Sequence, residues 1–128
     1  MKVDPDTVFS PQRLRERLTG FAVKYDEAVY VNNTPAGFHF LGPIEILSQA
    51  AVLRLAGMNI SQCHAKNISG EDGWLKECMD KHAGIGTRED VNILYSDCQV
   101  DACGDLTYVA YHYYKDPWSW NSCADRLR

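Results

Sequence analysis

The chain has 128 residues, of which 45% are hydrophobic and 23% are charged, and its net charge is −4. This length suits one domain with one buried core, so neither a cofactor nor a disulfide is required for stability. The longest nearly uncharged apolar run, around residues 50–52, is far shorter than the roughly 18 residues of a membrane span. The composition therefore excludes a transmembrane helix.

The N-terminal residues and the cysteines predict a cytoplasmic protein. No apolar stretch follows Lys2, as one would in a secretory signal. The five cysteines are odd in number and irregularly spaced, which argues against a disulfide framework, so we expect free thiols. Three Asn-x-Ser/Thr triplets begin at Asn32, Asn59 and Asn67. We expect them to be chance matches, because a cytoplasmic chain never meets the glycosylating enzyme.

The negative charge is concentrated in the middle of the chain. Residues 71–105 carry nine acidic and three basic side chains, a net charge of −6, whereas residues 1–70 and 106–128 each carry +1. Such a segment repels nucleic acid and attracts a basic protein surface, so we expect no direct nucleic-acid binding. The alternative is that these carboxylates form only a solvated face.

The first elements predicted along the chain are a helix and two strands. Ser10 and Pro11 form a helix start, and apolar residues follow at spacings of three and four for about four turns. Residues 28–32 and 37–41 then predict two short strands on either side of a turn.

Two further helices are predicted in the middle of the chain. One covers residues 44–57, follows Gly42 and Pro43, and ends at Gly57. Because it is apolar on most of its circumference, we expect it to be central and buried. A shorter helix is predicted over residues 73–83.

The last predicted element is a long β-hairpin, formed by residues 90–102 and 105–115. The element order is then α-β-β-α-α-β-β. Helices gathered on one face of a small, mostly antiparallel sheet make the predicted fold class α+β, in a single domain over residues 1–128.

A zinc site is the strongest metal hypothesis. Cys78 and His82 lie four residues apart on a predicted helix and project from one face, and Cys63 and His64 precede that helix in a loop. Two thiolates and two imidazoles complete a tetrahedral zinc site. The alternative is that the cysteines are ordinary buried thiols without metal.

The segment 37–57 resembles the central helix region of hot-dog-fold dehydratases and thioesterases, which have a histidine shortly before a helix with a glutamate and a glutamine. The matching residues are His39, Glu45, Gln49, Ala50 and Ala51. The resemblance implies acid–base chemistry by His39 and Glu45 on an acyl thioester. A hot-dog fold requires several long strands after this helix, whereas this chain supplies a loop, a helix and one hairpin. The alternative is that Glu45 only complements the dipole of its helix.

An aromatic cluster near the C-terminus is the most informative feature for function. Six of the fourteen Phe, Trp and Tyr residues lie within one stretch of 13, namely Tyr108, Tyr111, Tyr113, Tyr114, Trp118 and Trp120. Sheets that stack nucleic-acid bases interleave such residues with Arg and Lys, and here Lys115 stands alone. Tyr and Trp also form the core of small domains and the centre of protein interfaces.

Two functional hypotheses follow. The first is a non-catalytic protein-binding protein, such as an inhibitor, an immunity-type protein or an adaptor, and the charge of residues 71–105 favours a partner with a basic surface. Its binding residues are predicted to be Asp97, Asp101, Asp105, Tyr111, Tyr113, Trp118 and Trp120. The second is a small enzyme that uses His39 and Glu45, or a zinc-stabilised domain. A homodimer is compatible with both hypotheses, because the simplest cover for an exposed face of the hairpin is a second copy of the same chain.

Overall fold

The computed structural model describes residues 1–63, 70–95 and 103–128. The fold is a small α+β domain, as the sequence predicts. Its helices are α1 (Pro11–Thr19), α2 (Gln49–Gly57), α3 (Gly70–Cys78) and α4 (Pro117–Arg126). A 3-10 turn, Ile60–Gln62, follows α2, and a π-helical turn, Met79–Ala83, continues α3. None of the helices in the described ranges has the length and apolar character needed to cross a membrane.

The strands are short and form three small sheets. They are β1 (Lys2–Val3), β2 (Thr7–Phe9), β3 (Val29–Asn32), β4 (Ile44–Glu45), β5 (Gly86–Glu89), β6 (Leu94–Tyr95) and β7 (Ala110–His112). β1 and β4 form an antiparallel pair, and β3 and β5 form a parallel pair. β7 lies between β2, its antiparallel neighbour, and β6, its parallel neighbour.

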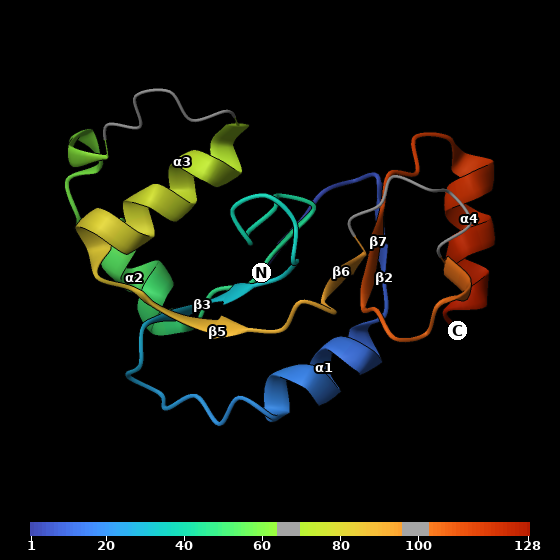
Figure 1. The fold of residues 1–128 in the computed structure, drawn as a ribbon, viewed down its shortest axis with the longest axis horizontal. Helices are drawn as coiled ribbons and strands as arrows, with labels where there is room; N and C mark the ends of the chain where they lie inside the picture. The colour runs from blue at the N-terminus through green and yellow to red at the C-terminus, as the bar shows by residue number, and fades with distance from the viewer. Residues whose placement is uncertain (64–69, 96–102) are drawn as a thin grey trace.

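Figure 1 shows α2 and α3 beside β3 and β5 at one end of the molecule, and α4 beside β2 and β7 at the other. A central apolar cluster joins the two ends, because it takes residues from α1, β3, β4, β6 and β7. Its buried members are Leu14, Val31, Ile44, Ile46, Ile93, Leu94, Val109 and Ala110. One further cluster lies at each end, under α2 and under α4.

The predicted β-hairpin is wrong. β6 and β7 run parallel, and β7 takes its antiparallel partner from β2 at the N-terminus. Asp90 ends the preceding extended segment with a tight turn, because its Oδ1 accepts from the Asn92 amide at 3.0 Å and its carbonyl accepts from the Ile93 amide at 3.1 Å. The rest of the predicted first strand, residues 96–102, lies outside the described residues.

The helix predicted over residues 44–57 begins later. Ile44 and Glu45 form β4, and Ser48 caps α2 by accepting from the Ala51 amide at 3.1 Å. The helix is also less buried than predicted, since Val52 and Leu53 are 50% and 64% exposed. The strand predicted over residues 28–32 is confirmed as β3, whereas residues 37–41 form a loop.

Two disulfides replace the predicted free thiols. Cys63 is bonded to Cys78, with Cα atoms 5.0 Å apart, and Cys103 is bonded to Cys123, with Cα atoms 5.5 Å apart. The first joins the loop after α2 to the end of α3, and the second joins the segment before β7 to α4. The prediction of free thiols is wrong at these four positions, because their pairing depends on contacts between distant parts of the chain. Cys98 lies outside the described residues.

Candidate protein-binding surface

The proposed zinc ligands do not form a metal site in this structure. Cys63 and Cys78 are bonded to each other, and a disulfide sulfur has no thiolate to offer a metal. His82 is exposed on the π-helical turn, and His64 lies outside the described residues. Within residues 1–63, 70–95 and 103–128, no three His, Cys, Asp or Glu side chains are arranged to hold a metal ion.

His39 and Glu45 do not form an acid–base pair. His39 is exposed, with φ of 67°, and its side chain makes no hydrogen bond to any described residue. Glu45 is only 5% exposed and lies in β4, where its Oε1 is 3.3 Å from the Nζ of Lys2. Burial raises the pKa of the Glu45 carboxyl, and the attraction of Lys2 opposes that rise. The short strands also differ from the long ones that a hot-dog fold requires.

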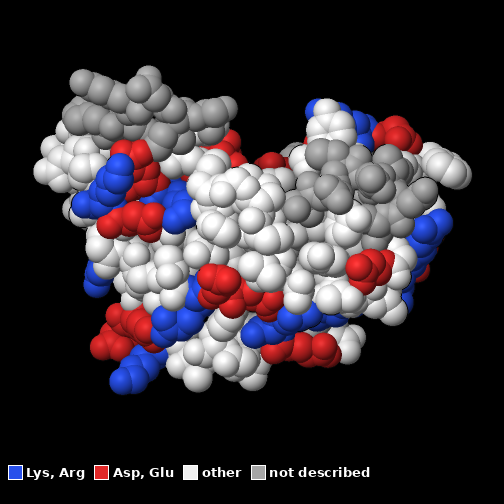
Figure 2. All heavy atoms as spheres, viewed as in Figure 1, with Lys and Arg blue, Asp and Glu red and all other residues white. Residues whose placement is uncertain are grey.

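Ion pairs neutralise much of the acidic middle segment. Four of its carboxylates pair with cations in the described residues: Lys2–Glu71 at 2.5 Å, Arg17–Asp90 at 3.2 Å, Lys76–Asp80 at 2.7 Å and Lys81–Glu77 at 2.9 Å. Acidic and basic atoms accordingly alternate over the face drawn in Figure 2. Asp97 and Asp101 lie outside the described residues, while Asp105 is exposed and accepts from the Thr107 amide at 3.0 Å. The described carboxylates therefore do not form a uniform acidic face.

The aromatic cluster divides into core and surface residues. Tyr111 is fully buried: its hydroxyl accepts from Arg13 Nη1 at 3.2 Å and donates to the carbonyl of Asp105, which places it in the core and not on a binding surface. Trp118 is 81% exposed and Tyr113 is 46% exposed. Tyr114 is buried, and Trp120 is partly buried against the cluster under α4.

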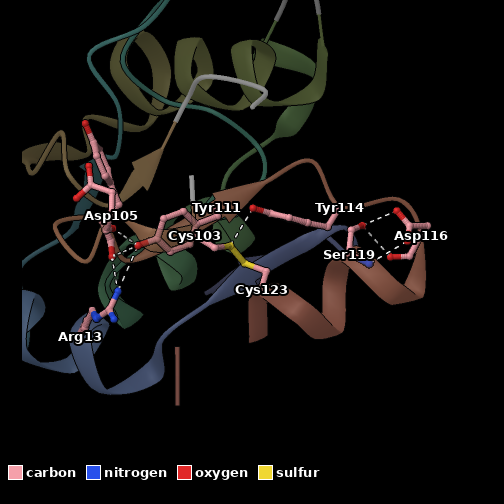
Figure 3. The surroundings of a disulfide bond; sticks show 9 residues. Arg13, Cys103, Asp105, Tyr111, Tyr114, Asp116, Ser119 and Cys123 are labelled. Atoms are coloured by element: carbon pink, nitrogen blue, oxygen red, sulfur yellow. Dashed lines mark hydrogen bonds between the residues drawn. A yellow bond between two sulfur atoms is a disulfide. The ribbon is translucent and has the colours of Figure 1, made fainter. Parts of the chain in front are cut away.

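Three interactions position the helix that carries Trp118: an N-cap, a disulfide and a contact of that disulfide with a buried tyrosine. At its start, the Asp116 carboxylate accepts from the Ser119 amide at 2.9 Å and from the Ser119 hydroxyl. Further along, the buried Cys123 is bonded to Cys103. The Tyr114 hydroxyl lies 2.8 Å from Cys103 Sγ and donates to it, because a disulfide sulfur carries no hydrogen. Figure 3 shows these groups in one row along α4.

Two hollows lie beside α4. One, with a volume of about 90 Å³, is lined by Trp118, Ser122, Arg126 and the Cys103–Cys123 disulfide, among others. The other, about 320 Å³, is lined by residues that include Lys115, Pro117 and Trp120. Tyr114 lines both hollows, and the first extends along α4 from Trp118 to Arg126.

Charges of both signs lie near Trp118. Arg126 is exposed and makes no ion pair with a described residue. Lys115 is exposed and its Nζ lies 4.2 Å from the centre of the Tyr113 ring, a cation–π contact. The carboxylates of this region each have a partner: Asp116 is occupied by the helix cap, Asp125 pairs with Arg128 at 3.2 Å, and Asp6 lies 3.5 Å from His112 Nε2. We define the α4 surface as Tyr113, Lys115, Pro117, Trp118, Ser122 and Arg126.

Helix α4 was not predicted from the sequence, although a signal for it is present. Asp116 and Pro117 repeat the arrangement of Ser10 and Pro11, a polar cap followed by proline at the first helical position. That signal separates Trp118, which lies on a helix, from the strand residues before it. The aromatic run therefore spans two elements with different exposure.

Comparisons with known proteins identify no relative: no family model, curated protein or solved structure matches this chain.

Proposed function

We propose that this chain is a non-catalytic protein-binding domain that docks a partner through the α4 surface. The observation that carries the proposal is the 81% exposure of Trp118 on a helix fixed by a disulfide, a cap and a buried tyrosine. A tryptophan held outward on a rigid scaffold loses little conformational freedom on binding. Tryptophan is also among the residues that contribute most to protein interfaces.

The surface also suggests the chemistry of the partner. The hollow beside Trp118 accepts an apolar side chain, and the Arg126 guanidinium at its rim donates hydrogen bonds to a carboxylate of the partner. The partner segment is accordingly expected to present an apolar or aromatic residue flanked by Asp or Glu. This differs from the basic partner that the charge of residues 71–105 suggests. That segment remains a hypothesis for a second contact, through Asp97, Asp101 and Asp105.

The test is selection of peptides from a displayed random library on the intact, non-reduced protein. Selected peptides should be enriched in an apolar residue next to an acidic one. Trp118→Ala should weaken their binding by about 30-fold or more, the effect of a central interface residue of about 2 kcal/mol. Tyr25→Ala is the matched control, because Tyr25 is also an exposed aromatic, at 87%, but lies outside the α4 surface. Its affinity should not change.

The same two variants distinguish binding at the α4 surface from binding elsewhere and from self-association. Both must keep the melting temperature of the parent protein, since neither side chain is buried. Peptides that bind equally well to the parent protein and to Trp118→Ala would reject the α4 surface. A dimer in sedimentation that dissociates in Trp118→Ala, but not in Tyr25→Ala, would identify the partner as a second copy of the chain.

The disulfides also bear on where the protein works. Two bonded pairs persist in an oxidising compartment and are rare in the cytoplasm, where thiols are kept reduced. We therefore favour an oxidising compartment over the cytoplasmic location predicted from the sequence.

A further inference from the structure

We propose that Asn59 is an acceptor site for an N-linked glycan. The triplet Asn59-Ile60-Ser61 has the acceptor pattern, in which a hydroxyl residue stands two positions after the asparagine. Our expectation that such triplets are chance matches depends on free thiols and a reducing compartment. Because Cys63 and Cys78 are bonded, the structure removes that premise at a position four residues from Asn59.

The geometry at Asn59 leaves its amide nitrogen available. Asn59 is exposed, and its Oδ1 accepts from both the Ser61 amide, at 3.1 Å, and the Ser61 hydroxyl, at 2.7 Å. Its Nδ2 makes no hydrogen bond to any described residue. Nδ2 is the atom that takes the sugar, so the fold tolerates a bulky, solvated substituent there.

The surroundings of Asn59 also favour a hydrophilic cover. Ile60 is 62% exposed, and Val52 and Leu53 on the preceding helix are 50% and 64% exposed. A glycan is large and solubilising, so it shields apolar surface next to its attachment point.

Asn32 provides an internal contrast with the same sequence pattern. Asn32 lies in β3 and its Oδ1 is buried, while the following residues Asn33 and Thr34 are both 0% exposed. Asn33 Nδ2 donates to the carbonyl of Ile44 at 2.6 Å inside the core. A glycan at Asn32 would therefore disrupt the contacts of β3. The third triplet, at Asn67, lies outside the described residues.

The chemical step is a group transfer from a lipid-linked oligosaccharide diphosphate. Asn59 Nδ2 forms a bond to the anomeric carbon of the first sugar, and the bond between that carbon and the diphosphate oxygen breaks. The lipid diphosphate leaves with the electron pair, and one amide proton passes to the transferring enzyme and then to water. The step needs no oxidant or reductant.

The test is secretion of the full chain, behind an export signal, from a eukaryotic host that carries this enzyme, followed by reduction and tryptic mapping. The map separates the three triplets, because Asn59 falls in the peptide 55–66, Asn67 in 67–76 and Asn32 in 25–54. We expect a glycan on peptide 55–66, removed by peptide N-glycosidase with conversion of Asn59 to Asp. Peptide 25–54 should carry none.

Variants keep the test independent of folding. Asn59→Gln and Ser61→Ala should each remove the glycan from peptide 55–66, whereas Ser61→Thr, which keeps the hydroxyl, should retain it. The proposal is overturned if peptide 55–66 of the secreted protein is unmodified while the Cys63–Cys78 bond is intact. A glycan on Asn32 in folded protein would overturn the argument from burial.

Discussion

Glu45 and Glu71 share one cation and yet differ in their electrostatic environment. Lys2 Nζ lies 3.3 Å from Glu45 and 2.5 Å from Glu71. The Glu45 side chain is 6% exposed and that of Glu71 is 72% exposed. Burial raises the pKa of Glu45, whereas the hydrogen bond from Lys2 lowers the pKa of Glu71. The two carboxyls therefore contribute to stability with opposite dependence on pH.

The prediction at this scale compares Glu45→Gln with Glu71→Gln between about pH 4 and pH 7. In the parent protein, Glu45 loses its proton in the unfolded chain before it does so in the folded one, so its contribution to stability falls as pH rises. Glu45→Gln should gain stability relative to the parent over this range. Glu71→Gln should lose stability relative to the parent over the same range. The pKa of Glu71 is lowered in the folded protein, so this carboxylate stabilises the folded state at pH values above its ordinary pKa. Urea denaturation at several pH values measures both, and parallel curves for the two variants would contradict the prediction.

At the scale of elements, the N-cap of α4 links stability to binding. Asp116 caps the turn that carries Trp118, so Asp116→Ala should cost about 1 kcal/mol of unfolding free energy and fray that turn. Peptides selected on the α4 surface should then bind several-fold more weakly. Asp116→Asn keeps a capping oxygen, so it should retain most of the stability and most of the peptide affinity of the parent protein. The two effects are measured by urea denaturation and by titration with a selected peptide.

Ser10→Ala is the control, because Ser10 caps α1 in the same way and is also followed by proline. It should lower stability by a similar amount, about 1 kcal/mol, and leave peptide affinity unchanged. If both variants weaken peptide binding equally, the effect of Asp116 is a general loss of stability, and the link between the cap and the α4 surface is refuted.

The sequence predicts elements well where local signals decide them. Ser10 marks the start of α1 and the short apolar run at residues 28–32 marks β3, and both are found in the structure. The second helix is misplaced because Gly42-Pro43 competes with Ser48, and in the structure the hydroxyl of Ser48 begins the helix. β7 could not be placed from the sequence, since its partners come from residues 7–9 and 94–95, and no local pattern encodes such distant pairing.

The candidate site was predicted only in part for the same reason. Trp118 and Tyr113 are on the surface as the interface hypothesis requires, but Tyr111, which the sequence assigned to the same binding surface, is buried in β7. The prediction of free thiols rests on the expected compartment and on the number of cysteines. Neither says which cysteines lie close together in the folded chain. Disulfide pairing depends on which cysteines the fold brings within about 6 Å between Cα atoms.

For the whole molecule, the two disulfides reinforce the two ends and leave the centre to apolar packing. Cys103 and Cys123 belong to the cluster under α4, and Cys63–Cys78 fixes the loop after α2 to α3. The members of the central cluster in the described part of the chain include no cysteine. In the chain-entropy model, the bonds close segments with sequence separations of 20 and 15 residues, and each contributes about 3 kcal/mol.

The last prediction follows from this division. Replacing Cys103 and Cys123 together by serine should lower the free energy of local unfolding at the α4 end by about 3 kcal/mol and speed amide exchange in α4, while exchange in β3 and β5 changes little. Replacing Cys63 and Cys78 together should have a similar cost but speed exchange in α3 instead. Hydrogen exchange followed by mass spectrometry of the two variants measures this. Faster exchange throughout the chain in either variant would contradict the prediction, because it would mean that each bond stabilises the molecule as a single cooperative unit.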